Sequence, residues 1–160
     1  MLITLELFVM LVLANGAPVV AAALLKKRWS APVDGGRLWR DGRPVLGNSK
    51  TWRGVVSGAL ACALFALMTG LGFVFGLLFG LLGLAGDMLS SFIKRRLGLA
   101  SSARALGLDQ IPEALLPMLL AMWWLPVSLW VVLLVVVLFT LSNIYGSPLL
   151  YRLGIRRQPH

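Results

Sequence analysis

The sequence predicts an all-α integral membrane protein with five transmembrane helices, and three observations support this. Hydrophobic residues make up 59% of the 160-residue chain, only 13% are charged, and the mean hydropathy is +0.87, well outside the range of ordinary soluble domains. The apolar runs are long enough to cross a bilayer as helices. All 15 basic residues lie between or after these runs. The runs leave no room for a separate soluble module, so residues 1–160 are predicted to form a single polytopic domain.

The first predicted span is residues 1–25. A cleaved signal peptide is the alternative, but no basic residue precedes the apolar stretch, and a proline follows closely after any cleavage point. We therefore interpret this segment as a retained helix. Its "NGAP" sequence (residues 15–18) is expected to kink the helix, and Asn15 either serves packing there or lines a cavity.

The middle apolar run, residues 55–89, is predicted to cross twice, with a hinge near "MTGLG" (residues 68–72). The last run, residues 111–150, is also long enough for two crossings. Pro126 lies near its middle among tryptophans that suit the membrane interface, so we expect a turn there. The polar "SNIYGS" (residues 142–147) is expected to break up the last helix, and its Asn143 is a second candidate for lining a cavity.

The basic residues fall into groups of eight, four and three, at residues 26–53, 94–104 and 152–157. If the middle run crosses twice, all three groups lie on one side of the membrane. The positive-inside rule then places the N-terminus outside, the C-terminus and two basic loops in the cytoplasm, and the protein in the cell (inner) membrane. A net charge of +9 would indicate nucleic acid for a soluble protein, but beside membrane spans it indicates orientation, so no nucleic-acid partner is expected.

Composition excludes several kinds of site. His160 is the only histidine and the last residue, which argues against a histidine zinc site, a histidine base and a Ser-His-Asp triad. Cys62 is the only cysteine, so no internal disulfide forms.

A polar cluster interrupts the end of the middle run in "GDMLSSFIKRRLG" (residues 86–98). Asp87, Ser90, Ser91, Lys94 and Arg95 have the spacing of a single helix face. A snorkelling basic cap explains the three cations but not the carboxylate, which is costly at the membrane boundary without a partner. Two interpretations of Asp87 remain open: a structural ion pair, or a ligand that holds Mg²⁺ against a polyphosphate.

Two further segments have open alternatives. The first loop, residues 26–54, combines glycines with cations, so it can wrap a polyphosphate or rest on anionic lipid headgroups; only the first accounts for Asp34 and Asp41. It is no P-loop, because Lys50 stands three residues after the second glycine. In "LDQIPE" (residues 108–113), Asp109 caps a helix or belongs to the site.

Glycines recur at intervals of three or four residues in the second half of the middle run. They are Gly72, Gly76, Gly80 and Gly83. Such a smooth face indicates tight helix packing, with a groove for the substrate as the alternative.

Together, "LGNSKTWRG" (residues 46–54), "GDMLSSFIKRRLG" and "LDQIPE" resemble the motifs of the CDP-archaeol synthase family, membrane cytidylyltransferases related to phosphatidate cytidylyltransferases. "ANGAP" near the N-terminus and Asn143 also fit. The resemblance implies a five-span helical enzyme whose cytoplasmic loops bind CTP and Mg²⁺. Such an enzyme condenses CTP with a membrane lipid phosphate, of the archaetidic or phosphatidic type, to give a CDP-lipid and pyrophosphate.

The resemblance and the residue types together lead to a hypothesis for the site. Asp87 and Asp109 hold Mg²⁺ and, with Lys94, form the catalytic group; the substrate-binding residues are Lys50, Arg53, Ser91, Arg95, Asn15 and Asn143. Lysine and arginine balance the phosphate charge, and Arg53 meets the lipid phosphate. Two rival functions are a non-catalytic membrane protein that binds anionic lipids and a CTP-dependent lipid kinase.

Overall fold

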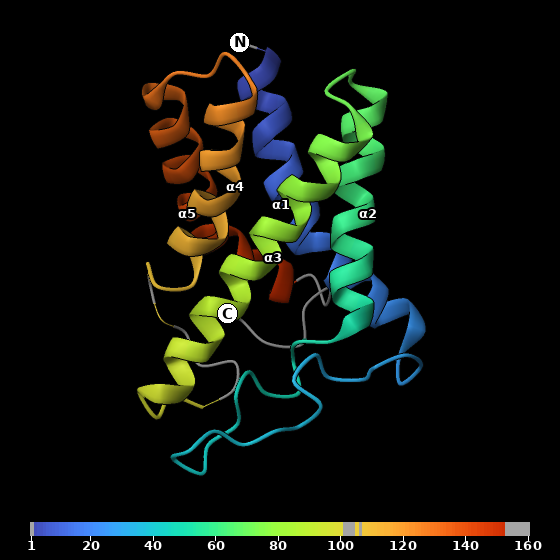
Figure 1. Ribbon diagram of the computed structural model, residues 1–160, viewed down its shortest axis with the longest axis vertical. Coiled ribbons are helices and arrows are strands. Elements are labelled where there is room, and N and C mark those ends of the chain that lie inside the picture. The colour runs from blue at the N-terminus through green and yellow to red at the C-terminus, as the bar shows by residue number, and fades with distance from the viewer. Residues whose placement is uncertain (1, 101–104, 106, 153–160) are drawn as a thin grey trace.

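In the computed structural model, which describes residues 2–100, 105 and 107–152, the chain folds into α-helices joined by turns and one long loop (Figure 1). The helices are α1 (Leu2–Leu25), α2 (Trp52–Met68), α3 (Phe73–Arg96), α4 (Gln110–Trp124) and α5 (Leu129–Arg152). These described residues contain no β-strand, only two isolated β-bridges within or at the end of the α1–α2 loop. The all-α prediction and the count of five helices are therefore confirmed.

Two of the three predicted helix breaks are also confirmed. The middle run separates into α2 and α3 at residues 69–72, where Gly70 and Gly72 adopt positive φ angles that favour glycine. The last run turns at residues 125–128, around Pro126. The expected break at "SNIYGS" was wrong, because α5 continues through it. Ser142 and Asn143 both donate side-chain hydrogen bonds to the carbonyl of Phe139, so their polar groups are satisfied within the helix.

Helix length distinguishes the membrane-spanning elements. With 24 residues each, α1 and α3 are long and apolar enough to cross a membrane. The shorter α2 and α4 have 17 and 15 residues, at and just below the lower end of the roughly 17–25 residues typical of a helix that crosses a membrane. In α5 the apolar part is Leu129–Tyr145. Large apolar side chains such as Leu64 and Leu134 are exposed on these helices, as expected for surfaces that face lipid.

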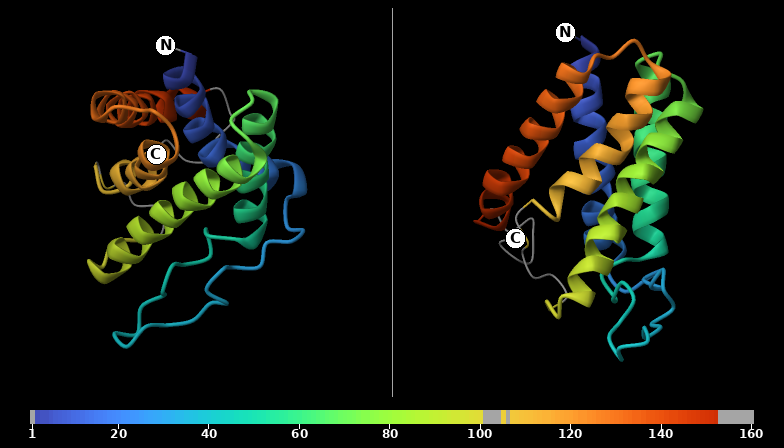
Figure 2. Two further views of the ribbon diagram at one scale, coloured as in Figure 1. Left: turned by 45° about the horizontal axis from the view of Figure 1, so that its top comes forward. Right: turned by 60° about the vertical axis from the view of Figure 1, so that its left-hand side comes forward.

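The helices form a bundle in which α3 crosses obliquely and packs against α1, α2 and α4, while α5 packs against α4 and α1 (Figures 1 and 2). The α1–α2 loop and the C-terminal end of α3 lie at one end of the bundle. The start of α1 and the α2–α3 and α4–α5 turns lie at the other (Figure 1). The end that carries the loop is called the polar end below.

The interior far from the polar end is filled by apolar side chains. Phe75, Phe79 and Phe139 are at most 1% exposed. Phe75 also contacts the ring of Trp124, with 6.1 Å between centroids. Toward the polar end, the buried positions of α3 change from phenylalanine to serine, lysine and arginine.

Glycine allows α2 and α3 to approach closely. A Cβ atom at Gly76 would lie 2.5 Å from both the Ala66 Cβ and the Cys62 carbonyl oxygen, and one at Gly80 would lie 3.0 Å from the Ala59 Cα. At these two glycines the packing interpretation is confirmed. Gly72 instead forms the N-cap of α3. A groove of about 230 Å³ also follows this seam; it is lined by Val55, Val56, Ala59, Leu60, Leu77 and Leu81.

Candidate functional site

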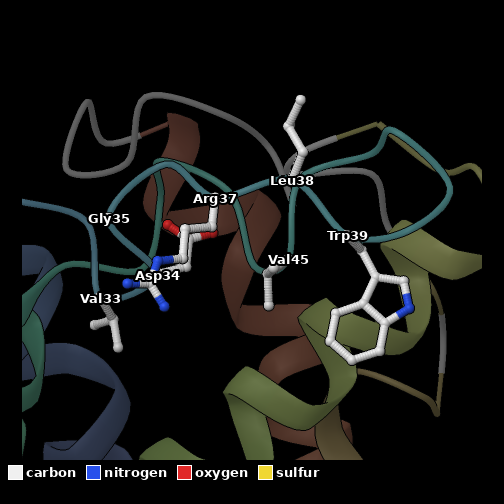
Figure 3. Close-up of a pocket in the computed structure, with 7 residues that line it drawn as sticks. All are labelled: Val33, Asp34, Gly35, Arg37, Leu38, Trp39 and Val45. Atoms are coloured by element: carbon white, nitrogen blue, oxygen red, sulfur yellow. The ribbon is translucent and has the colours of Figure 1, made fainter.

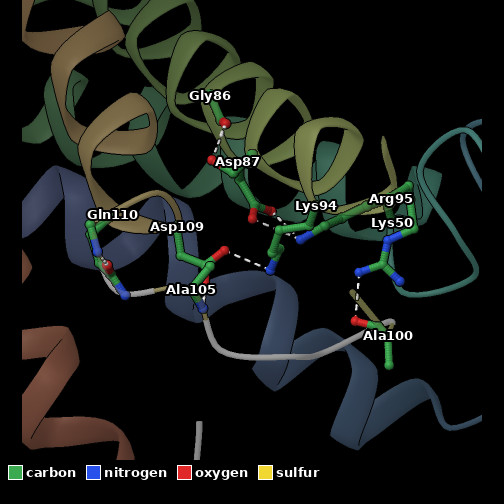
Figure 4. A network of polar contacts seen from close by, with 11 residues as sticks. Lys50, Gly86, Asp87, Lys94, Arg95, Ala100, Ala105, Asp109 and Gln110 are labelled. Atoms are coloured by element: carbon green, nitrogen blue, oxygen red, sulfur yellow. Dashed lines mark hydrogen bonds and ion pairs between the residues drawn. The ribbon is translucent and has the colours of Figure 1, made fainter. Parts of the chain in front are cut away.

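The first contact of the candidate site joins the α1–α2 loop to α3. Lys50 ends the loop and donates its Nζ to both carboxylate oxygens of Asp87, at 2.7 and 2.6 Å (Figure 4). The two side chains are 20% and 31% exposed, so the ion pair is partly accessible to solvent. Residues separated by 37 positions in the chain thus meet at the polar end of the bundle (Figure 1).

The second contact joins α3 to the start of α4. Lys94 Nζ lies 2.6 Å from Asp109 Oδ1, and the second oxygen of Asp109 accepts the backbone N–H of Ala105 at 2.9 Å (Figure 4). Asp109 was predicted either to cap a helix or to belong to the site. It occupies the N-cap position of α4, but its side chain makes no capping hydrogen bond. Its carboxylate is directed to Lys94 instead.

Gly86 lets α4 come this close to α3. A Cβ atom there would lie 2.2 Å from the carbonyl oxygen of Pro112 and 2.7 Å from the Cα of Glu113. These are backbone atoms, so a side chain at Gly86 would force the helices apart. The two helices therefore approach each other closely next to Asp87 and one turn from Asp109.

Ser90, Ser91 and Arg95 complete the predicted face of α3, and all three are buried. Ser90 donates to the carbonyl of Gly86, while Arg95 donates Nη2 to the carbonyl of Ala100 at 2.6 Å. Among the described residues, the buried Nε of Arg95 has no hydrogen-bond partner. The buried Nε atoms of Arg53 and Arg96 are likewise without a partner in the described part of the chain, so the Nε of Arg95 is a donor available to an anionic ligand rather than a sign specific to this cluster.

The charges of this cluster fit a metal-bound polyphosphate. Asp87 and Asp109 supply two negative charges, and Lys50, Lys94 and Arg95 supply three positive ones. Carboxylate oxygens are the protein ligands that Mg²⁺ prefers, usually one or two of them with phosphate oxygens and water. No group of three or more His, Cys, Asp or Glu side chains able to hold a metal occurs among the described residues. Asp87 and Asp109 are the carboxylates of this cluster that could hold Mg²⁺, and phosphate oxygens and water would have to supply its other ligands.

Asp34 organises the loop that carries Lys50. Its carboxylate accepts the backbone N–H groups of Gly36, Leu46 and Gly47 at 2.8–3.0 Å, so it joins the two limbs of the loop. Partial burial raises the pKa of this carboxyl, but these backbone hydrogen bonds outweigh that effect and lower it below the ordinary value of 3.8. The ionised form is therefore the one that stabilises the loop.

Replacing Asp34 with asparagine is expected to loosen the loop. The carboxylate accepts three backbone N–H groups with two charged oxygens, whereas an amide has only one, uncharged oxygen acceptor. At pH 7 we expect backbone hydrogen exchange at Leu46 and Gly47 to become about tenfold faster. Since the folded-state pKa is lowered, the stabilisation is complete above pH 3.8 and is lost as the pH falls through the folded value. The measurement is hydrogen exchange by mass spectrometry, corrected for intrinsic rates. The exchange rates of the wild-type protein and the Asp34→Asn variant should become equal in acid. A difference between them that does not change with pH would contradict the role of the ionised Asp34 carboxylate in holding the loop.

Three predicted binding residues lie elsewhere. Arg53 donates Nη1 to the carbonyls of Lys26 and Arg28, at 2.9 and 2.7 Å, and so holds the turn that follows α1. Asn143 bonds within its own helix. Asn15 is half-buried in α1. Within the described residues, none of the three makes a hydrogen bond to the Asp87 or Asp109 pair, so their substrate roles stay predictions.

Sequence reasoning missed the residues that shape this site. Gly86 opens the "GDMLSSFIKRRLG" motif and follows Gly83 by three residues, so the glycine spacing that predicted close packing at Gly76 and Gly80 was the signal that could have found it. The α1–α2 loop offered a better signal for a structural role of its acidic residues, since binding to lipid headgroups left Asp34 and Asp41 unexplained.

In the structure this loop surrounds an open hollow of about 620 Å³ (Figure 3). It is lined by Val33, Asp34, Gly35, Arg37, Leu38, Trp39 and Val45.

Comparisons with known proteins agree on one family. The CarS-like family, described as CDP-archaeol synthase, matches residues 2–73 and 66–160. A CDP-archaeol synthase of Hyperthermus butylicus is 43% identical over 61% of this chain, and the chain spans only 59% of that relative. The enzyme of the same name from Methanosphaerula palustris is 34% identical over 89% of this chain and 96% of its own length.

One solved structure, titled as an intramembrane enzyme for archaeal membrane lipid biosynthesis, superimposes with a TM-score of 0.68. It is 29% identical in sequence, and the superposition covers 86% of this chain and 90% of that one.

Proposed function

Because the chain belongs to the CarS-like CDP-archaeol synthase family, we propose that it is a cytidylyltransferase that condenses CTP with a membrane lipid phosphate. The products are a CDP-lipid and pyrophosphate, and an archaetidic-type lipid phosphate is the first substrate to test, with phosphatidic acid second. The observation that carries the proposal is the pairing of Asp87 and Asp109 with Lys50 and Lys94 at one end of an apolar bundle. This arrangement offers phosphate-binding charge where a lipid headgroup would lie.

The chemistry needs little acid–base help from the protein. A lipid phosphate oxygen is ionised at neutral pH, so it attacks the α-phosphorus of CTP without losing a proton. A new P–O bond forms, the bond from the α-phosphorus to the bridging oxygen breaks, and pyrophosphate leaves with the electron pair. Positioning and charge neutralisation then account for most of the rate enhancement.

Each residue of the cluster has a role that its place supports. Asp87 and Asp109 would hold Mg²⁺, which supplies neutralisation of the triphosphate charge. Lys50, Lys94 and Arg95 bind phosphate oxygens, and the free Nε of Arg95 is one available donor. Ser91, buried on the same face of α3, orients the phosphates.

We extend the proposal to topology. All five helices lie in the membrane with the N-terminus outside, the polar end and the C-terminus face the cytoplasm, and the bilayer is the cell (inner) membrane. The clustering of the loop cations with Lys94, Arg95 and Arg96 at one end of the bundle supports this orientation. The lipid chains pack against the apolar helices, and CTP enters from the cytoplasm.

Product analysis tests the function. Purified protein in detergent is incubated with Mg²⁺, CTP labelled at the α-phosphorus, and a panel of isoprenoid ether and diacylglycerol phosphates. We expect the label to appear in a CDP-lipid with an equal amount of pyrophosphate. A CTP-dependent lipid kinase would leave the label in CDP, and a non-catalytic protein would leave it in CTP; either outcome contradicts the proposal.

A further inference from the structure

We propose that the tip of the α1–α2 loop and the last turn of α3 form a clamp that positions Lys50 for CTP. Its members are Trp39, Asp41, Arg43, Phe92 and Arg96. The inference rests on the proposed function and adds positioning residues to it. None of the five belongs to the Asp87 and Asp109 pairs.

Arg96 forms the centre of the clamp. Its guanidinium pairs with the Asp41 carboxylate and donates to the carbonyl of Pro44. The same group lies 5.9 Å from the ring centroid of Trp39 and 5.1 Å from that of Phe92. Arg96 therefore contacts the loop with both its charge and its flat face, although it directly follows Lys94 and Arg95 in the sequence.

Two residues of the loop tip also contact the end of α3. Trp39 packs edge-on against Phe92, with 5.3 Å between centroids and 85° between rings. Arg43 donates Nη1 to the carbonyl of Arg96 at 2.9 Å, satisfying an oxygen that the end of the helix leaves free. Gly98, which has a positive φ angle, leaves room for this arginine, because a Cβ atom there would lie 3.0 Å from Arg43 Nη1.

The position of Arg96 separates it from phosphate binding. It follows Asp87 by nine residues, about two and a half helical turns, so it lies on the opposite face of α3. Lys94 and Arg95 are buried on the side of the site, whereas Arg96 is turned to the loop. One run of three cations thus serves two purposes.

The clamp and the Lys50 pair hold the same stretch of chain. Residues 43–50 are attached to α3 at both ends, by the Arg96 contacts and by the bond from Lys50 to Asp87. Backbone hydrogen bonds from Val45 to Arg37 and from Val33 to Lys50 hold this limb against the other one. A segment fixed at both ends samples fewer conformations, so less entropy is lost when Lys50 binds a phosphate.

Arg96→Met and Asp41→Asn test the clamp from its two sides. Both variants are expected to raise the KM for CTP about tenfold while kcat changes less than threefold, because the reacting groups stay intact. Hydrogen exchange of the backbone over residues 43–50 should accelerate in both, and Arg96→Lys should recover part of the protection. The matched control is Arg40→Met, which removes one exposed cation from the same loop tip.

The outcomes are distinct. Unchanged exchange and an unchanged KM in Asp41→Asn would overturn the clamp, and that exposed position does not endanger folding if Arg96→Met proves unstable. An equal rise in KM for Arg40→Met would also overturn it, since loss of general attraction for CTP would then suffice. If the wild-type protein makes no CDP-lipid, the proposed function fails, whereas hydrogen exchange still decides whether the clamp holds the loop.

Discussion

Asp87→Asn is expected to lower the rate of CDP-lipid formation by about 10²–10³-fold. The carboxylate accepts two hydrogen bonds from Lys50 and is one of two candidate oxygen ligands for Mg²⁺. An amide keeps the shape but supplies no negative charge, so it weakens metal binding and frees Lys50. Partial exposure of the pair lets water solvate the lysine, and we expect the fold to survive.

The measurement compares turnover and Mn²⁺ binding, the latter by electron paramagnetic resonance with CTP present. Glu6→Gln is the matched control, because it makes the same chemical change in α1 at the end of the bundle opposite the polar end. Full turnover and full Mn²⁺ binding in Asp87→Asn would show that the Lys50–Asp87 pair is only structural. That result would leave the cytidylyltransferase proposal without its metal site.

Gly86→Ala is expected to have an effect of similar size for a different reason. The new Cβ atom would lie 2.2 Å from the Pro112 carbonyl oxygen, so α4 has to move away from α3. Overpacking of this kind costs about 1–3 kcal/mol of stability. It would also shift Asp109 relative to Asp87, and a displacement near 1 Å can reduce turnover about 10²-fold.

Gly83→Ala is the matched control for this substitution. It lies one turn earlier in α3, and its Cβ atom would sit 3.6 Å from the nearest atoms, an ordinary contact. Thermal unfolding in detergent and turnover are measured for both variants. Equal, small effects of the two alanines would contradict the close approach of the helices at Gly86.

Much of the architecture was predictable because membrane helices are recognised from patterns of residues close together in the sequence. Apolar runs, glycine at residues 70 and 72, and Pro126 located the breaks between helices. Helical spacing also correctly predicted that Asp87, Ser91, Lys94 and Arg95 share one face of α3. Both kinds of inference use residues close together in the chain.

The pairings across the chain were not predictable in this way. Which lysine meets which aspartate depends on how the α1–α2 loop folds back on α3, and composition does not reveal that path. The contacts of Arg96 with the α1–α2 loop were not evident because it stands in a run of three cations that all suit phosphate. The bonds from Arg53 to the turn after α1 were likewise not predictable, and its assignment to the lipid phosphate stays a prediction.

The phenylalanines that fill the half of the bundle away from the loop have an electrical consequence. Phe75, Phe79 and Phe139 are at most 1% exposed, and a file of water needs polar partners that such a filling does not offer. Under the proposed function, the triphosphate and its counterions lie at the polar end, and these phenylalanines offer no polar groups to line a path for ions from there to the opposite end of the bundle. Cells that overproduce it should keep their proton-motive force.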